Sequence, residues 1–183
     1  MSFELSTARF KLRDVVKEDL GDLIVAYNDA EVLKYLCYPS FPLRDEEVIE
    51  YITRWEKEQS ADPRTDFNLG IELKGKVIGL VSLSAVDRTP GVATLSYSLG
   101  RPYWGSGIAT EVARRVIDFG FSDLDLRRID AETSPNNLRS QKVLEKLGFS
   151  QEGLRKKHRV MSTGEVHDLI IYGLLKQAKN VVS

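Results

Sequence analysis

The chain has 183 residues, 42% of them hydrophobic and 29% charged, which fits one domain with a buried core. Its 26 Lys and Arg balance 27 Asp and Glu, so the overall charge provides no general attraction to nucleic acid or to an anionic membrane. No apolar run in the sequence approaches the roughly 18 residues that suggest a membrane span. We therefore expect neither nucleic acid nor a membrane as a partner.

Three further features concern location and domain organisation. Residues 1–10 contain neither the basic segment nor the apolar segment of a secretory signal. Cys37 is the only cysteine, so we expect no intramolecular disulfide and no bound metal. No repeat, low-complexity tract or flexible linker divides the sequence. These features predict a cytoplasmic protein with one domain over residues 1–183 and a core over residues 9–176.

The first third of the chain has the pattern of one strand followed by two helices. Apolar and charged residues alternate over residues 9–15, as in a half-buried strand. Apolar residues then recur at helical spacing over residues 17–30 and again over residues 45–59. We expect a helix in each of these two segments.

The middle of the chain has three strand-like runs in close succession, over residues 67–73, 77–86 and 92–99. The connections between them are short and contain Gly75 and Gly91, which favour tight turns. This spacing predicts an antiparallel meander.

The last third alternates helices and strands. A helix is predicted over residues 107–121, a strand over residues 127–132, and a second helix over residues 137–147. Two closing strands are predicted over residues 149–157 and 165–175. The complete order, β-α-α-β-β-β-α-β-α-β-β, predicts an α/β fold in which helices pack on a mixed sheet.

The segment between the third meander strand and the next helix has the composition of an anion-binding loop. Its small residues let several backbone N–H groups approach one point, and the unpaired N–H groups at a helix start attract an anion such as a pyrophosphate. Gly107 is the sharpest requirement, since a Cβ there would intrude where backbone and ligand approach. The loop consists of Trp104, Gly105, Ser106, Gly107, Ile108, Ala109 and Thr110.

Other interpretations of this loop stay open. A tight turn without a ligand would have the same composition. A P-loop requires Lys and then Ser or Thr after its last glycine, and this segment has neither in place. The dinucleotide fingerprint requires a third glycine at the position of Thr110 and usually opens a parallel sheet, so a dinucleotide-dependent enzyme is the weaker alternative.

A second polar cluster lies at the start of the helix predicted over residues 137–147. Asn136 or Asn137 is suited to cap this helix. A cap does not by itself explain why a second asparagine and Ser140 should lie together at the mouth of the sheet.

Together these segments resemble the GNAT acetyltransferases, and specifically their RimJ/RimL-like branch, which includes ribosomal-protein N-terminal acetyltransferases. The resemblance covers nearly the whole chain, from residues 7–13 to Tyr172. Three segments resemble, in order, the family's splayed strand, its pyrophosphate loop and its second cofactor motif. They are residues 97–99, 104–111 and 137–149.

The resemblance implies an α/β domain whose mixed, mostly antiparallel sheet is splayed between the fourth and fifth strands, with four flanking helices. Acetyl-CoA would lie in this opening, with CoA as the product, and its pyrophosphate would contact the backbone of the loop from Trp104 to Thr110. The pantetheine arm would pair with the strand backbone at Ser98, Leu99 and Gly100.

The same resemblance implies two side-chain roles and a direct mechanism. Asn137 would hold the pantetheine arm, and Ser140 would lie near the sulfur. A neutral primary amine would attack the thioester without a covalent enzyme intermediate, and backbone N–H groups near Leu99 would stabilise the oxyanion. Ser140 would then donate a hydrogen bond to the leaving thiolate. The alternative is that Ser140 is a structural residue on the helix face.

The general base is the least determined part of the site. Some ribosomal-protein relatives carry Glu where this chain has Arg159, and relatives often carry Glu where it has Thr94. Both departures put a ribosomal-protein substrate in doubt. Asp168 is our candidate for a catalytic base and Glu165 an alternative, although carboxylates at strand ends are also typical solvated or capping groups.

His158 and His167 carry imidazoles that could act as a base, yet histidines on such a hairpin are usually surface residues. The acceptor is left open between a protein N-terminal amine and a small amine, and an acyl-CoA-binding module without turnover is a further alternative. Residues 155–159 contain four fixed cations, which we expect either to attract an acidic acceptor or simply to face water. The oligomeric state is also open, with a dimer as one option.

Overall fold

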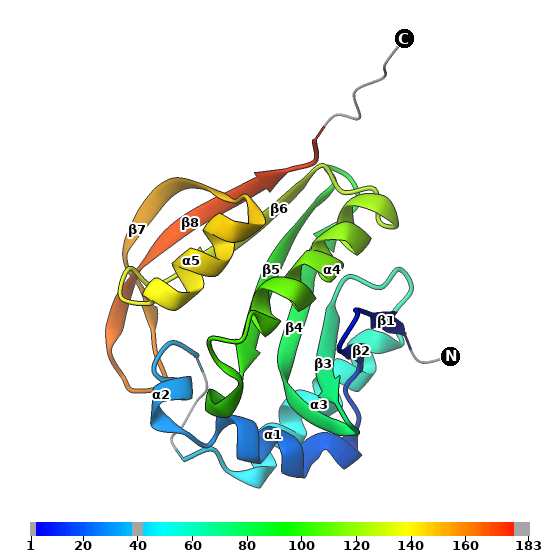
Figure 1. The fold of residues 1–183 in the computed structure, drawn as a ribbon, viewed down its shortest axis with the longest axis vertical. Helices are drawn as coiled ribbons and strands as arrows, with labels where there is room; N and C mark the ends of the chain where they lie inside the picture. The colour runs from blue at the N-terminus through cyan, green and yellow to red at the C-terminus, as the bar shows by residue number, and fades with distance from the viewer. Residues whose placement is uncertain (1–2, 38–41, 178–183) are drawn as a thin grey trace.

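The structure is a computed structural model that describes residues 3–37 and 42–177. Eight strands form one sheet in the order β1-β2-β3-β4-β5-β6-β8-β7, with helices on both faces (Figure 1). The strands are β1 (Glu4–Ser6), β2 (Lys11–Asp14), β3 (Phe67–Leu73), β4 (Lys76–Asp87), β5 (Val92–Leu99), β6 (Arg128–Thr133), β7 (Ser150–Val160) and β8 (Val166–Leu175). The helices are α1 (Leu20–Tyr27), α2 (Ala30–Leu33), α3 (Asp45–Gln59), α4 (Ile108–Ser122) and α5 (Leu138–Leu147), with 3-10 turns at Lys17–Asp19 and Arg101–Tyr103.

The sheet opens between β5 and β6, which form the one parallel pair among the described strands. The two strands are paired only where residues 92–94 lie beside residues 128–130. Beyond this point β5 continues to Leu99 and β6 to Thr133, and the two strands diverge as the arms of a V (Figure 1). These are the fourth and fifth strands of the sequence prediction, so the expected splay is confirmed.

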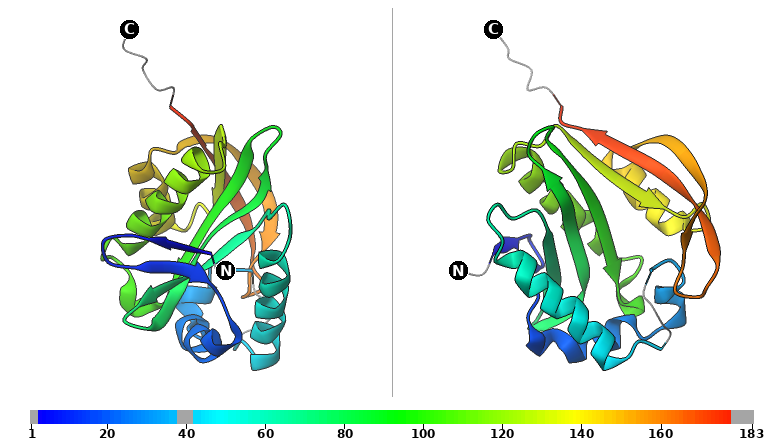
Figure 2. Two further views of the ribbon diagram at one scale, coloured as in Figure 1. Left: turned by 90° about the vertical axis from the view of Figure 1, so that its right-hand side faces the viewer. Right: turned by 180° about the vertical axis from the view of Figure 1, so that it is seen from behind.

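Helices α4 and α5 cover one face of the sheet, and α1 and α3 cover the other (Figure 2). The alternation of buried and half-exposed residues along β6 shows the division. Ile129 and Ala131 are buried in the cluster that also contains residues of α4 and α5, whereas Asp130 and Glu132 are half-exposed. Because successive side chains of a strand point to opposite faces, Asp130 and Glu132 lie on the α1/α3 face.

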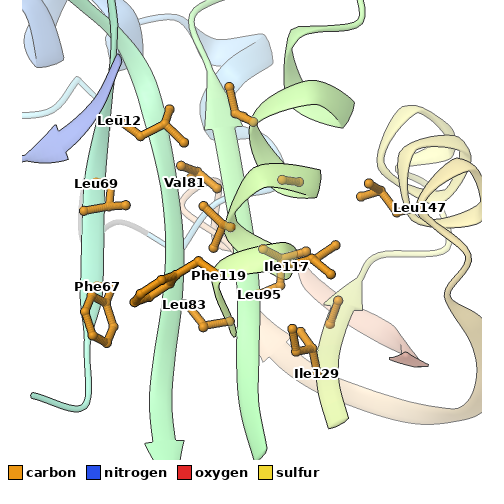
Figure 3. Packing of buried hydrophobic residues seen from close by; sticks show 14 of the residues in the cluster. Leu12, Phe67, Leu69, Val81, Leu83, Leu95, Ile117, Phe119, Ile129 and Leu147 are labelled. Atoms are coloured by element: carbon orange, nitrogen blue, oxygen red, sulfur yellow. The ribbon is translucent and has the colours of Figure 1, made fainter. Parts of the chain in front are cut away.

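The larger hydrophobic core lies beneath α4 and α5 (Figure 3). Leu69, Leu83 and Ile129 from three different strands are fully buried there, and Ile117 and Phe119 of α4 pack among them. A second cluster, which includes Leu23, Tyr27 and Ile52, joins α1 and α3 to the sheet.

The structure confirms most of the predicted elements. The helix at residues 45–59 and the strands at residues 67–73 and 92–99 have the predicted bounds. No helix in the described part of the chain is long and apolar enough to cross a membrane.

The first third of the chain differs from the sequence prediction in two respects. The expected helix over residues 17–30 is a 3-10 turn followed by α1 and α2, because Asp29 caps a new helix by accepting a hydrogen bond from the N–H of Glu31. The described residues therefore contain the four expected longer helices, α1, α3, α4 and α5, and the short additional helix α2. Strand β1 was not predicted, because a run of only three residues carries no readable alternation.

Candidate active site

The predicted anion-binding loop lies directly before α4, at one end of the opening. Gly105 and Gly107 adopt φ of 75° and 79°, left-handed values that glycine alone adopts without strain. The first helical bond runs from the N–H of Glu111 to the carbonyl of Gly107, so the N–H groups before Glu111 precede the hydrogen bonds of the helix. A Cβ added at Gly107 would meet no protein atom within 4 Å. The backbone there faces open space, as a ligand site requires.

Side chains hold this loop in place. The indole Nε1 of Trp104 donates to the carbonyl of Leu99 at 2.8 Å, and the Oγ of Ser106 donates to the carbonyl of Tyr103 at 2.7 Å. The guanidinium of Arg139, on α5, lies 4.9 Å from the centre of the Trp104 ring. This cation–π contact joins the loop to the helix on the other side of the opening.

The backbone N–H groups of the three residues that were predicted to contact the pantetheine arm do not all point the same way. Gly100 donates its N–H to the carbonyl of Ile78 in β4. Backbone groups of a strand alternate in direction, so Ser98 also faces β4, while Tyr97 and Leu99 face the opening. The N–H groups of Tyr97 and Leu99 are thus directed toward the opening, whereas those of Ser98 and Gly100 are directed toward β4.

Asn137 is the N-cap of α5. Its side-chain oxygen accepts a hydrogen bond from the N–H of Ser140 at 3.2 Å, as expected of an asparagine before a helix. The neighbouring Asn136 accepts, at its backbone carbonyl, a hydrogen bond from the hydroxyl of Tyr35 at 3.0 Å. Asn137 therefore caps the helix through its side chain, Asn136 is bonded through its backbone, and the cap places Ser140 in the first turn of α5.

Tyr97 and Ser140 meet across the opening. The phenol oxygen lies 3.0 Å from Oγ of Ser140 and donates to the Ser140 carbonyl at 3.1 Å. Burial raises the pKa of Tyr97 to about 12, because the interior disfavours the phenolate. The phenol is therefore a neutral hydrogen-bond donor at physiological pH. The sequence analysis missed this contact, for which the only signal was a tyrosine between two serines on the splayed strand.

Asp168 lies apart from this pair, on β8. Its Oδ1 accepts a hydrogen bond from the backbone N–H of Lys157 at 2.7 Å. Lys157 has a φ of 45° and lies in an irregularity of β7, between Arg155 and Arg159. The contact gives Asp168 a structural role and offers no support for its role as a base.

His167 and Glu165 form a second titratable pair near the hairpin turn. The Nε2 of His167 lies 2.9 Å from Oε2 of Glu165, and the imidazole is 7% exposed. The ring of Tyr35 packs beside the imidazole at a centroid distance of 6.2 Å. The expectation that His167 is a surface residue is wrong, because this histidine is buried. In the described ranges, no group of three His, Cys, Asp or Glu residues could hold a metal ion.

Comparison with known proteins identifies the family. The "Acetyltransferase (GNAT) domain" family matches residues 9–150. An uncharacterised N-acetyltransferase named p20, from Bacillus licheniformis, is 33% identical over 94% of this chain and 96% of its own. The spermidine N(1)-acetyltransferase of Escherichia coli K12 is 27% identical over 78% of this chain and 74% of its own.

A solved structure has the same fold. The ribosomal L7/L12 α-N-protein acetyltransferase RimL, in complex with coenzyme A, aligns over 94% of this chain and 98% of its own with a TM-score of 0.84, at 19% identity. The expected RimJ/RimL-like fold is therefore confirmed. The chain belongs to the GNAT acetyltransferase family, and it is an N-acetyltransferase that transfers an acetyl group from acetyl-CoA to an amine.

Proposed function

We propose that acetyl-CoA lies in the opening between β5 and β6, with its pyrophosphate on the loop from Trp104 to Thr110 and its acetyl group near Leu99 and Ser140. One observation carries this proposal: the N-terminal ends of α4 and α5 lie on opposite sides of the opening, and Tyr97 and Ser140 meet across it. Helix N-termini favour anions, and the open backbone at Gly107 leaves room for the phosphates.

The reaction proceeds by direct transfer. The nitrogen of a neutral amine attacks the thioester carbon, the carbon–sulfur bond breaks, and the amine proton passes to a base or to water. The N–H of Leu99, which faces the opening, stabilises the negative charge on the carbonyl oxygen. Ser140 donates to the leaving thiolate, and the neutral phenol of Tyr97 holds Ser140 in position.

Asn137 contributes to cofactor binding through the part of its side chain that the cap does not use. Its oxygen is bonded to the N–H of Ser140, so its NH2 group is the part available to an acceptor oxygen of the pantetheine arm. Asp168 as the general base stays a prediction. Its hydrogen bond to Lys157 favours a structural role instead.

The acceptor is a primary amine that approaches from the α1/α3 face, since the cofactor loop and α5 occupy the other side. Two acceptor classes remain: the N-terminal amine of a peptide or protein, and a small amine. We propose that the enzyme acts in the cytoplasm, where acetyl-CoA is made and used.

The decisive experiment measures acetyl-CoA consumption with a panel of amines, short peptides with free N-termini and aminoglycosides. The Ser140→Ala variant is assayed in parallel with the best acceptor. Turnover that depends on one class of amine supports the proposal. A protein that binds acetyl-CoA tightly and consumes none with any amine would instead be an acyl-CoA-binding module.

A further inference from the structure

Glu132 is clamped by two arginines on the face of the sheet from which the acceptor approaches. Arg155 donates to Oε1 at 2.6 Å and Arg159 donates to Oε2 at 2.9 Å. The side chains of the two arginines are 53% and 44% exposed, whereas that of Glu132 is 19% exposed. We call the cluster of Glu132, Arg155 and Arg159 the arginine clamp. Its carboxylate is mostly buried, whereas its two guanidinium groups are accessible to solvent.

A bulge in β7 brings the two arginines together. Arg155 lies opposite Leu169 and Arg159 lies opposite His167, so four steps along β7 match two steps along β8. Residues four apart on a regular strand would be roughly 13 Å apart, too far to share one carboxylate. Bulges commonly redirect side chains beside active sites. Here the hydrogen bond from the N–H of Lys157 to Asp168 holds the bulge.

The arginine clamp lies just beyond the point where the sheet opens. Glu132 is two residues beyond Asp130, the last residue of β6 that pairs with β5, which places it about 7 Å along the strand from the point where the sheet opens. Glu132 shares the α1/α3 face with Ser98, whose hydroxyl is bonded to Tyr27 of α1. A peptide whose N-terminal amine reaches the opening would extend its next few residues across the clamp.

The arginine clamp has the charge and the hydrogen-bond donors to bind an anion. Two guanidinium groups and one carboxylate give the clamp a net positive charge. Each guanidinium has five N–H donors and gives one bond to Glu132, so donors remain for a second carboxylate. A polyamine would meet like charge at this position. Lys156 and Lys157 add exposed positive charge on the same strand.

We infer that Arg155 and Arg159 bind a carboxylate of the acceptor, and that the preferred acceptor is a peptide or protein N-terminus followed by acidic residues. This inference rests on the proposed function for the position of the amine. It differs from general charge attraction because it assigns recognition to the two arginines and not to the neighbouring lysines.

The test measures binding without turnover. Two N-acetylated peptides, identical except for Glu or Gln at the third and fourth positions, are titrated into the protein saturated with CoA. We expect the Glu peptide to bind about tenfold more tightly at low salt, with the preference shrinking as salt is raised. The Arg155→Gln/Arg159→Gln variant should lose this preference. The Lys156→Gln/Lys157→Gln variant removes the same charge and should keep it within about threefold.

Equal binding of the two peptides by the parent protein would overturn the inference, as would an equal loss in the lysine variant. The arginine variant leaves the Glu132 carboxylate unpaired, which could destabilise the fold. Adding Glu132→Gln removes this charge, so the triple variant separates lost peptide recognition from misfolding. Assaying the free-amine peptides and spermidine separates the inference from the proposed function. Selective binding without acetylation of any amine would contradict only the proposed function, and faster acetylation of spermidine than of the acidic peptide would contradict only the inference.

Discussion

The contact between Tyr97 and Ser140 positions the Ser140 hydroxyl for its proposed hydrogen bond to the leaving thiolate. We expect Ser140→Ala to lower kcat by about tenfold or more while leaving the affinity for acetyl-CoA nearly unchanged, because a thiolate forms only as the bond breaks. Tyr97→Phe should lower kcat in the same way but less strongly. Steady-state kinetics with the best acceptor, together with acetyl-CoA titration, measures both effects. Unchanged kcat in Ser140→Ala would make Ser140 a structural residue.

The raised pKa of Tyr97 predicts how these effects vary with pH. Its phenol stays protonated up to a pKa of about 12, so the kcat ratio of parent to Tyr97→Phe should be the same at pH 7 and pH 9. In strong alkali the ionisation of Tyr97 also changes the stability of the fold. The Tyr97 phenol ionises near pH 10 in the unfolded chain and near pH 12 in the folded chain. The parent should therefore lose stability between these values, and Tyr97→Phe should lose less.

Two substitutions at Asp168 distinguish a general base from a structural carboxylate. An amide oxygen can still accept the hydrogen bond from Lys157, whereas it cannot take a proton from the amine. If Asp168 holds the bulge, Asp168→Asn should keep most of the activity and Asp168→Ala should lose selectivity for acidic peptides. Equal and severe loss of kcat in both variants would restore Asp168 as the general base. The N-acetylated peptide pair of the binding test measures the selectivity, and the free-amine forms of the same peptides measure kcat.

At the scale of single elements, the direction of backbone groups along β5 predicts which amides respond to the cofactor. The N–H groups of Tyr97 and Leu99 face the opening, while that of Gly100 is bonded to Ile78 of β4. Acetyl-CoA should therefore slow hydrogen exchange at Leu99 and in the first turn of α4. The N–H of Gly100 should exchange slowly with or without the cofactor. Exchange measured by NMR at single residues would test this alternation.

The sequence predicted the elements around the site better than the contacts within it. Glycines and small residues marked the loop before α4, since only they permit its left-handed turns. The cap of α5 was narrowed to Asn136 or Asn137 from local sequence alone, and the structure assigns it to Asn137. The bond between Tyr97 and Ser140 joins residues 43 positions apart, and the arginine clamp depends on a bulge in β7. Neither leaves a local pattern, because both arise from how distant strands pack.

At the scale of the whole molecule, the opening divides the sheet into two arms that the cofactor would join. One arm carries β1 to β5 with α4, and the other carries β6, β8 and β7 with α5 (Figure 1). At about 100 times its dissociation constant, acetyl-CoA should stabilise the fold by about 2.7 kcal/mol. For a chain of this size, that corresponds to roughly 5 to 10 °C in Tm.

Gly107→Asp should abolish this stabilisation, because it places bulk and negative charge at the anion site. A matched control is Gly75→Asp, in the turn between β3 and β4. Gly75 has a similar φ of 77° and equally open surroundings, so the backbone strain is comparable. Thermal unfolding of both variants with and without acetyl-CoA provides the measurement. A normal shift in Gly107→Asp would contradict the proposed position of the pyrophosphate.

The position of Trp104 makes it an intrinsic fluorescence probe of the cofactor site. Its indole is bonded to Leu99 and faces Arg139 at the mouth of the opening, whereas Trp55, the other tryptophan, is 8% exposed in the core beneath α3. A charged ligand in the opening should change the field and the water around Trp104 more than around the buried Trp55. In a Trp55→Phe variant, the emission wavelength and intensity of Trp104 would report how much of the cofactor site is occupied. Acceptors that bind without being acetylated would then become visible in a simple fluorescence titration.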